Sequence, residues 1–399
     1  MRILTIVDLP WDARLGAVRI LMELARTWEA AGHEVTHYCL GDAFPDKTSC
    51  PPRSAWRRLR FPQKAAAFVR KNAARFDVID AIVGTLAVPK TRLNFNGLLV
   101  ARSIGSHRLY RDFETMARER WPENNASLAQ TARPMTDSPW RARTKIAGRI
   151  FYTYLQRQLF RNAEKALQYC DLVNVPNEIE LESFGKTKPA MVQPYGLSQK
   201  WFLNEAAVSP ETRLAQQKIS FIGMWSLRKG ARDWGEIIRQ VRAGVPNARF
   251  KFLGTMTGNE RVMLDLNVSP CDWIEIVSEY QPDDLPNLLS DATVGAFPTY
   301  AEGFGLGLLE QLAAGIPAVA YDAPGPQSIL KRSLPELLIP VGNVEQFSAA
   351  LVQILSADLA SYNKLVERSI EVASRYVWST IARETTRLYE THLARLADH

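Results

Sequence analysis

Short apolar runs alternate with amphipathic segments over the first 200 residues of the chain. The apolar runs predict strands at Ile3–Val7, Glu34–Leu40, Asp77–Val83, Leu98–Arg102 and Asp171–Val175. Apolar residues at helical spacing predict helices at Ala17–Ala31, 62–76 and Arg149–Gln168. Strands that alternate with helices are typical of a parallel sheet built from βαβ units.

The same alternation restarts after a polar stretch with prolines, from about Gln193 to Lys218, which predicts a domain boundary. Strands are predicted at Ile219–Ile222, Arg249–Leu253, Trp273–Val277, Thr293–Phe297 and Ala318–Tyr321, and helices at Ala231–Ala243, Asp283–Ser290 and Phe304–Ala314. We therefore expect an α/β fold with two Rossmann-like domains, residues 1–200 and 201–378, facing each other across a cleft. A last helix within residues 379–399 has no strand after it and is free to pack back on the first domain.

One long segment breaks the pattern. Residues 121–144 contain Pro122, Pro134 and Pro139 among polar residues and show no hydrophobic period. Stretches of this length without a period are usually functional loops or locally disordered segments, so we expect irregular structure here.

Composition adds little until the charges are located. Apolar residues make up 46% of the chain and charged residues 23%, which is ordinary for a globular protein and excludes disordered, collagenous and disulfide-scaffold classes. The net charge of +7 is concentrated in two segments. Residues 51–75 hold eight basic side chains and no acidic one, and residues 141–165 hold seven basic side chains against Glu164 alone. The rest of the chain is net negative.

The four cysteines are scattered and form no metal-binding spacing, which favours a reducing, cytoplasmic compartment. The apolar run at the N-terminus is soon interrupted by Asp8, so it predicts a strand and not a signal peptide. No apolar run reaches the length of a membrane span. Any membrane association is therefore expected to be peripheral, at the inner face of the plasma membrane.

The segment from Pro298 to Pro317 carries the clearest chemistry. A strand ends at Pro298, a glycine-rich turn follows, and a helix is predicted from Phe304. Glycines let a ligand approach the backbone, and amides at a helix start favour phosphate or sugar oxygens. Glu302 in the turn and Glu310 on the helix provide carboxylates for sugar or ribose hydroxyls.

With this motif the chain resembles a family-4 glycosyltransferase of the GT-B fold, and the resemblance covers nearly the whole chain. The family's E-x7-E signature corresponds to Glu302 and Glu310. Residues 273–297 are similar to the run that approaches the nucleotide, residues 318–329 to the strand and turn after the motif helix, and residues 2–40 to the family's first βαβ unit.

The resemblance implies a retaining transfer of a hexose-type sugar from a nucleotide-diphosphate-sugar, without a metal or other cofactor, to a glycan or lipid-linked acceptor on the first domain. The catalytic residues that it implies are Lys229, Glu302 and His107, and we add Arg228 as a catalytic candidate beside Lys229. The donor-binding residues are Gly16, Gly223, Gly303, Phe304, Gly305, Leu306, Glu310 and Tyr280. The leaving diphosphate develops negative charge, which lysine, arginine and a helix start can stabilise in place of a metal.

Three positions depart from the family pattern. Met224 stands where the family has an arginine, and Arg228 beside Lys229 is one candidate to supply that charge. Ile104 stands where a histidine is usual, while His107 matches the second histidine of that segment and is equally well explained as a loop residue. Gly16 is a single glycine where many relatives have a pair, and a plain turn residue is the alternative.

The basic segments allow two interpretations. Ala65, Phe68 and Val69 recur at helical spacing opposite Lys64 and Lys71, as in an ordinary helix that covers a sheet. The alternative is an outer basic face, extended by Trp56 and Arg57–Arg60, that contacts an anionic membrane surface through residues 53–75 and 141–154. No nucleic-acid motif accompanies the charge, so no nucleic-acid partner is expected.

Two other functions remain open from the sequence. Met224 and Ile104 are compatible with a catalytically silent relative that only binds a nucleotide-sugar or glycan. A nucleotide-sugar epimerase of the same fold would release an altered sugar and need no acceptor. The residues identify neither the base and sugar of the donor nor the acceptor.

Overall fold

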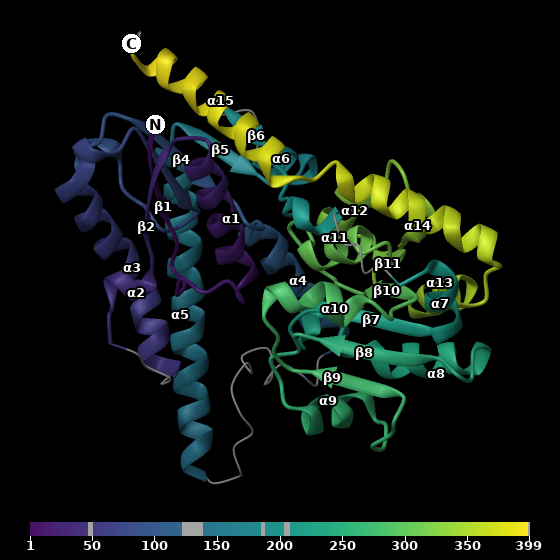
Figure 1. Cartoon of the computed structure of the whole chain (residues 1–399). Coiled ribbons are helices and arrows are strands. Elements are labelled where there is room, and N and C mark those ends of the chain that lie inside the picture. The colour runs from purple at the N-terminus through teal and green to yellow at the C-terminus, as the bar shows by residue number, and fades with distance from the viewer. Residues whose placement is uncertain (47–50, 122–138, 185–187, 203–207, 398–399) are drawn as a thin grey trace. The chain divides into compact units, whose positions relative to one another are not determined.

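The computed structural model describes residues 1–46, 51–121, 139–184, 188–202 and 208–397, without the side chains of 51–52, 107, 139–152, 183–184, 200 and 397. The chain divides into two compact units (Figure 1). Unit 1 consists of Met1–Pro176, Leu181–Gln193 and Ala382–His399. Unit 2 consists of Asn177–Glu180 and Pro194–Ile381.

Unit 1 is built on a six-stranded sheet in the order β2-β1-β3-β4-β5-β6, with every neighbouring pair parallel. Its strands are β1 (Arg2–Ile6), β2 (Glu34–Tyr38), β3 (Val78–Ile82), β4 (Leu98–Arg102), β5 (Leu172–Val175) and β6 (Ala190–Val192). All residues of β3, β4 and β5 are buried, as expected for central strands covered on both faces. The sequence did not predict β6, which has only three residues.

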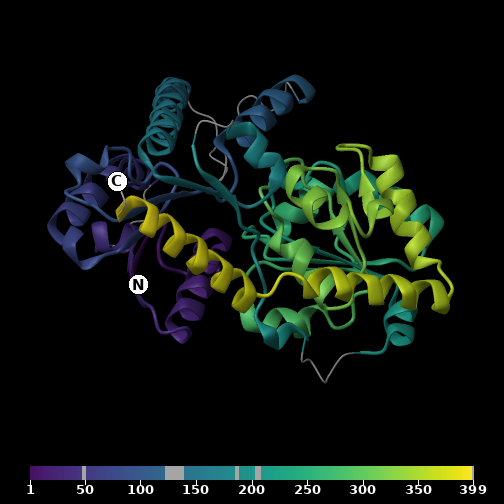
Figure 2. The same cartoon turned by 90° about the horizontal axis from the view of Figure 1, so that it is seen from above.

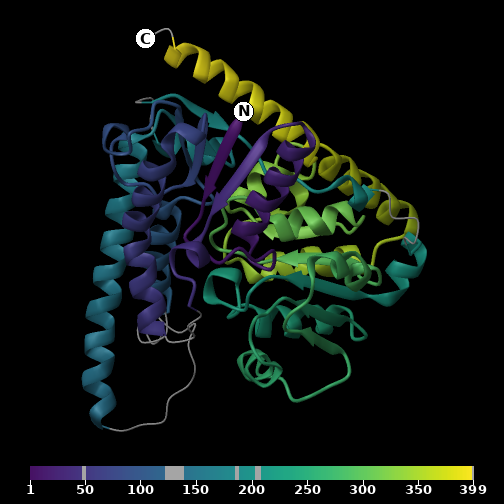
Figure 3. The ribbon, with the colours of Figure 1, turned by 60° about the vertical axis from the view of Figure 1, so that its left-hand side comes forward.

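The unit 1 helices are α1 (Gly16–Ala30), α2 (Leu40–Ala43), α3 (Pro51–Asn72), α4 (His107–Arg120), α5 (Pro139–Tyr169) and α6 (Glu178–Phe184), whose first residues count with unit 2. The long helices α3 and α5 run side by side (Figures 1 and 3). Phe61, Ala65 and Val69 of α3 are buried in the core that they form with residues of the unit 1 sheet. The interpretation of this segment as a core-covering helix is therefore confirmed for its apolar stripe.

Unit 2 repeats the doubly wound plan in the order β12-β11-β10-β7-β8-β9, again with parallel neighbours. The strands are β7 (Lys218–Ile222), β8 (Arg249–Leu253), β9 (Ile274–Val277), β10 (Val294–Phe297), β11 (Ala318–Tyr321) and β12 (Leu338–Ile339). The helices are α7 (Pro210–Gln216), α8 (Trp234–Gly244), α9 (Asn259–Leu266), α10 (Leu285–Leu289), α11 (Leu306–Ala313), α12 (Pro324–Leu330), α13 (Val344–Leu355) and α14 (Leu359–Ser374).

These two parallel sheets with helices confirm the predicted α/β class. Two helix boundaries were predicted wrongly. The basic helix begins at Pro51, not at residue 62, because the helix continues through Pro62. Helix α5 begins at Pro139, so irregular structure is wrong for residues 139–144, where the proline occupies the first helical position that suits it. The rest of that stretch, 122–138, lies outside the described residues.

The last helix, α15 (Trp378–Ala397), belongs to unit 1 from Ala382 onward and lies beside α1 (Figures 1 and 2). The Trp28 indole N–H donates to the Ala382 carbonyl at 3.3 Å. Tyr389 reaches a fully buried ion pair, in which Arg102 donates to Asp80 at 2.6 Å. The Tyr389 hydroxyl donates to Asp80 at 2.8 Å, so the helix completes a polar network inside the first unit.

The described residues contain no helix that is both long and apolar enough to cross a membrane. Among the same residues, no three histidine, cysteine or acidic side chains lie together as a metal-binding group.

Candidate functional site

The glycine-rich turn of unit 2 connects the carboxyl end of β10 to α11. Gly305 precedes the helix in the left-handed conformation, with φ of 103°, which glycine adopts without strain. The backbone of the turn is held from two sides. The backbone amide of Gly325 at the start of α12 donates to the Glu302 carbonyl at 2.9 Å, and the side-chain amide of Asn177 donates to the Gly303 carbonyl at 2.5 Å.

Lys229 and Arg228 both contact the Glu302 carboxylate. They lie in a short 3₁₀ turn, Leu227–Lys229, that follows β7, the strand beside β10. The Lys229 ammonium forms an ion pair with the Glu302 carboxylate, and an Arg228 nitrogen lies 3.5 Å from the same oxygen. The side chains of Lys229 and Glu302 are only 13% and 16% exposed. Two neighbouring cations therefore face one carboxylate, which leaves the cluster net positive.

The excess positive charge has consequences for both titrating groups. Burial lowers the pKa of Lys229 below its ordinary value, and Glu302 opposes this only in part. Burial alone would raise the pKa of Glu302, but the charges of Lys229 and Arg228 outweigh it and hold that pKa below the ordinary value. The Lys229 ammonium also lies 4.7 Å from the centre of the Phe297 ring, a distance at which a cation and an aromatic face attract.

The turn that carries the cations is fastened to the turn that carries the carboxylate. The Arg228 carbonyl accepts from the Tyr300 amide at 2.8 Å, and an Arg228 nitrogen donates to the Ala301 carbonyl at 2.8 Å. Behind them, Asp233 at the start of α8 accepts from the hydroxyls of Tyr300 and Tyr321 at 2.8 and 2.7 Å.

Sequence reasoning missed Asp233, Tyr300, Tyr321 and Asn177. Tyr300 lies within the Pro298–Pro317 segment and Tyr321 just after it, but neither was given a role, and the partners of all four residues lie far away along the chain. The available signal was a tyrosine near the carboxyl end of each of two strands, Tyr300 after β10 and Tyr321 at the end of β11. Their role in the structure is to fix the position of the Glu302 turn.

Three further loops leave the same edge of the sheet and pair through their backbones. The Gly223 amide donates to the Leu253 carbonyl at 2.9 Å, and the Gly254 amide donates to the Val277 carbonyl at 2.8 Å. Tyr280 packs against Gly254, where an added Cβ would lie 3.0 Å from its ring. Met224, the residue in the arginine position, is 44% exposed. Gly223 and Tyr280 thus lie in neighbouring loops at the edge that carries Lys229 and Glu302.

The remaining donor-binding candidates of unit 2 differ in accessibility. Gly303 and Gly305 are buried, and their backbone forms the turn itself. Leu306 is partly exposed at the first turn of α11. Phe304 is buried between the rings of Tyr195 and Tyr376, so it packs inside the unit. Glu310 is 2% exposed, which leaves its carboxylate far less open to solvent than that of Glu302.

The candidates from the first half of the chain lie in unit 1. Gly16 is the first residue of α1, and an added Cβ would meet nothing within 4 Å. His107 is the first residue of α4, and its side chain is outside the described ones. Ile104, in the position of the usual histidine, lines a pocket of about 620 Å³.

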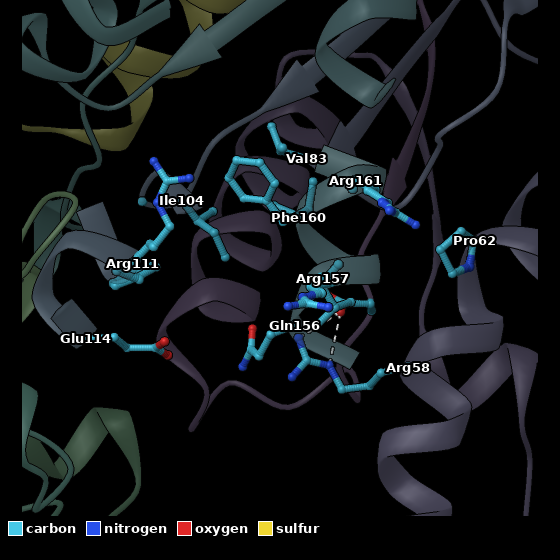
Figure 4. A pocket seen from close by; sticks show the side chains of 16 residues that line it. Arg58, Pro62, Val83, Ile104, Arg111, Glu114, Gln156, Arg157, Phe160 and Arg161 are labelled. Atoms are coloured by element: carbon cyan, nitrogen blue, oxygen red, sulfur yellow. Dashed lines mark hydrogen bonds and ion pairs between the residues drawn. The ribbon is translucent and has the colours of Figure 1, made fainter. Parts of the chain in front are cut away.

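That pocket, called the unit 1 pocket below, opens between α3, α4 and α5 at the carboxyl ends of β1, β3 and β4 (Figure 4). Val83, Ile104 and Phe160 form an apolar part of its lining. Its charged lining consists of Arg58, Arg111, Arg157, Arg161, Asp8 and Glu114. The two basic segments of the sequence, which are far apart along the chain, therefore meet at one pocket.

Not every arginine of the first basic segment is on the surface. Arg57 is 6% exposed, and its guanidinium pairs with Asp46, so the expectation that it belongs to an outer basic face is wrong. Arg58 donates to Asp8 at 2.9 Å across the unit 1 pocket lining. Trp56 is exposed at 47% and carries the Arg60 guanidinium over its ring.

Comparison with known proteins gives a family match for part of the chain. Residues 216–357 match the family described as "Glycosyl transferases group 1". The phosphatidyl-myo-inositol mannosyltransferase of Mycolicibacterium smegmatis is 37% identical over 251 residues, which are 62% of this chain and 58% of that protein. The chain spans between 24% and 58% of the length of the curated relatives at the head of this comparison.

Solved structures match over nearly the whole chain. Sucrose-phosphate synthase from Thermosynechococcus elongatus has a TM-score of 0.71 at 17% identity, over 99% of this chain and all of that one. Anabaena HepE in complex with UDP-glucose has a TM-score of 0.64 at 14% identity, over 98% of this chain and all of that one. At such identities the likeness shows the fold. The chain therefore has the GT-B fold, and its residues 216–357 are similar to the glycosyl transferases group 1 family.

Proposed function

We propose that this protein is a glycosyltransferase that moves a hexose-type sugar, with retention, from a nucleotide-diphosphate-sugar to a glycan or lipid-linked acceptor. The observation that carries the proposal is the cluster of Lys229, Arg228 and Glu302 beside the glycine turn at the start of α11. The family of residues 216–357 supports transfer of a glycosyl group. The structural neighbour HepE holds UDP-glucose, and a relative is named for mannosyl transfer to a phosphatidylinositol.

The proposed chemistry follows from the charges of the cluster. As the bond between the sugar's anomeric carbon and the phosphate oxygen breaks, the diphosphate gains negative charge. In this proposal Lys229, Arg228 and the amides at the start of α11 stabilise that charge, and the contact of both cations with Glu302 of the adjoining turn supports this role. The acceptor oxygen then bonds to the anomeric carbon on the same face, and its proton passes to the leaving phosphate oxygen. Glu302 orients the two cations and accepts hydroxyl hydrogen bonds from the sugar.

We further propose that no metal ion takes part and that the enzyme works in the cytoplasm, in polysaccharide or glycolipid synthesis at the inner membrane face. The two cations on one carboxylate support the first point, since they supply the positive charge that a metal would bring. The scattered cysteines support a reducing compartment such as the cytoplasm. Turnover in the presence of excess EDTA tests metal independence, and complete loss that added Mg²⁺ restores would contradict it.

The decisive measurement is a panel of UDP-, GDP- and ADP-sugars added to the purified protein. One donor is expected to raise the unfolding temperature and to be slowly hydrolysed. Lys229→Ala is expected to lower the hydrolysis rate about 100-fold or more, because it removes a charge that acts on the leaving group. The matched control is Lys331→Ala, an exposed lysine of unit 2, which should leave the rate unchanged.

The variant Glu302→Gln distinguishes a specific effect of Glu302 on the two cations from a general loss of structure. Without the carboxylate, the pKa of Lys229 falls further, so the ammonium is lost at lower pH and the alkaline limb of the rate profile moves to lower pH. If no donor binds and Lys229→Ala changes nothing, the proposal fails. Binding without turnover would indicate a silent relative, and an altered free sugar without acceptor would indicate an epimerase.

A further inference from the structure

Two arginines of the unit 1 pocket have no partner within the described part of the chain. Arg157 and Arg161 lie four residues apart on α5, on the same face of the helix, and both line the pocket. Neither forms a hydrogen bond or an ion pair with any described residue. Like charges at this spacing repel each other, and this face of α5 carries two of them without an ion-pair partner among the described residues.

Other elements bring more positive charge to the same pocket. Arg111 enters from α4, with its guanidinium 5.0 Å from the centre of the Phe160 ring. Figure 4 shows Arg157 and Arg161 in the same pocket lining as Arg111 and as Arg58, which donates to Asp8. Four arginines thus line the pocket against the two carboxylates of Asp8 and Glu114.

We propose that the unit 1 pocket binds the phosphate group of a phosphorylated sugar or polyol, which is the acceptor of the transfer. Arg157 and Arg161 are the phosphate-binding residues, because the planar guanidinium donates two parallel hydrogen bonds to phosphate oxygens. The role as acceptor rests on the proposed function, whereas the binding of the phosphate does not.

The rest of the lining suits the polyol part of such a ligand. A volume of about 620 Å³ is that of a small-molecule site and leaves room beyond one phosphate group. The Glu114 carboxylate can accept hydrogen bonds from hydroxyl groups. Ile104 and Phe160 offer apolar surface to the carbon face of a ring. Ile104 in place of a histidine fits this arrangement, since it adds no charge beside the arginines.

The test measures binding of glucose 6-phosphate, with glucose as the matched uncharged probe, by calorimetry on the full chain at low salt. The wild type is expected to bind glucose 6-phosphate and not glucose. Arg157→Gln/Arg161→Gln is expected to weaken this binding about tenfold or more, because charge-assisted hydrogen bonds are lost. The unfolding temperature should not fall, since neither arginine has a described partner.

The control Arg53→Gln/Arg75→Gln removes the same charge from α3 and the turn after it, outside the pocket. It should leave the binding of glucose 6-phosphate nearly unchanged. Equal weakening in both double variants, or wild-type binding of glucose and glucose 6-phosphate with equal affinity, would overturn the proposal. Donor binding by unit 2 is measured separately with the nucleotide-sugar panel, so a failed glycosyltransferase proposal and a failed pocket are told apart.

Vesicles distinguish a free phosphate from a lipid headgroup. Phosphatidylcholine vesicles with phosphatidylglycerol are floated with the protein, and glucose 6-phosphate is added as a competitor. Binding that the competitor releases, and that Arg157→Gln/Arg161→Gln loses, identifies a lipid headgroup as the source. Binding of glucose 6-phosphate without vesicle binding identifies a soluble phosphate. Vesicle binding that the competitor does not affect and that both double variants weaken equally contradicts the pocket.

Discussion

Gly230 shows how closely the cation turn and the carboxylate turn approach each other. It follows Lys229 with φ of 79°, and a Cβ at this position would lie 2.3 Å from the Pro298 carbonyl oxygen. Both the backbone conformation and the contact therefore require glycine. The position of Lys229 depends on a residue that has no side chain.

Gly230→Ala is accordingly expected to lower the free energy of unfolding by about 1–3 kcal/mol, through left-handed strain and the clash with Pro298. Urea unfolding measures the loss, and donor binding is expected to weaken with it. Gly258→Ala is the control, because Gly258 has φ of −62° and nothing near its missing Cβ. Equal losses in the two variants would contradict this account.

At the residue scale, the sequence predicted the charged residues of the site better than the residues that hold them in position. Lys229 and Glu302 follow from a local motif, and the structure brings them into contact. Whether Arg228 faces the same way as its neighbour was not decidable from spacing, because adjacent side chains in a turn have no fixed relation. Asp233 and its two tyrosines were invisible, since their contacts join segments about 70 and 90 residues apart in a sheet order that must be known first.

At the element scale, one carboxylate joins two neighbouring strands of unit 2. Asp291, just before β10, accepts from Lys251 of β8 at 2.9 Å and pairs with Lys218 of β7. Burial raises the pKa of Asp291, but the hydrogen bonds from the two lysines outweigh it, so the net pKa is lowered. A carboxyl with a lowered folded pKa stabilises the fold above its unfolded pKa and loses this effect as the pH falls through the folded value.

Asp291→Asn should therefore destabilise the protein by about 1–2 kcal/mol at pH 7, because the variant loses the ion pairs with the two lysines. The side chain is 35% exposed, so water screens part of the interaction. Between pH 7 and pH 3 the wild type should lose more stability than the variant, because only the wild type has this carboxylate to protonate. Urea unfolding at both pH values measures the difference. Parallel losses in the two proteins would contradict the assignment.

Helix and strand types were predicted well for long elements with a clear period, and poorly for short or unusual ones. The central strands β3 and β4 are buried along their whole length and are apolar except for Asp80 and Arg102, which leaves little ambiguity. The two-residue strand β12 carries too few positions to show a period. The predicted starts of α3 and α5 were too late, because Pro62 lies inside the first helix and Pro139 begins the second, whereas proline more often interrupts a helical pattern.

At the scale of the whole molecule, the buried pair of Arg102 and Asp80 links the last helix to the first sheet. Removing the Tyr389 hydroxyl takes a hydrogen bond from both charged groups, at 3.1 and 2.8 Å. Tyr389→Phe is expected to cost about 1–3 kcal/mol, because the buried charges lose a polar partner. Hydrogen exchange should accelerate in β3 and β4 and stay unchanged in the strands of unit 2.

A second buried tyrosine, in unit 2, provides the matched control for Tyr389→Phe. Tyr362 of α14 is fully buried in unit 2 and donates to the Thr293 carbonyl at 2.7 Å. Tyr362→Phe should accelerate exchange around β10 and leave β3 and β4 unchanged. If both variants affect the same strands, the assignment of α15 to unit 1 has no energetic basis.

The path of α15 also bears on how the protein is made. Unit 1 receives its first strands from the start of the chain, yet the hydroxyl that bonds Arg102 comes 287 residues later. During synthesis from the N-terminus, the sheet of unit 1 emerges from the ribosome long before the helix that completes its polar network. Until then Arg102 and Asp80 lack the Tyr389 hydroxyl as a partner. Unit 1, although first in the sequence, is therefore finished only after the whole of unit 2 has been translated.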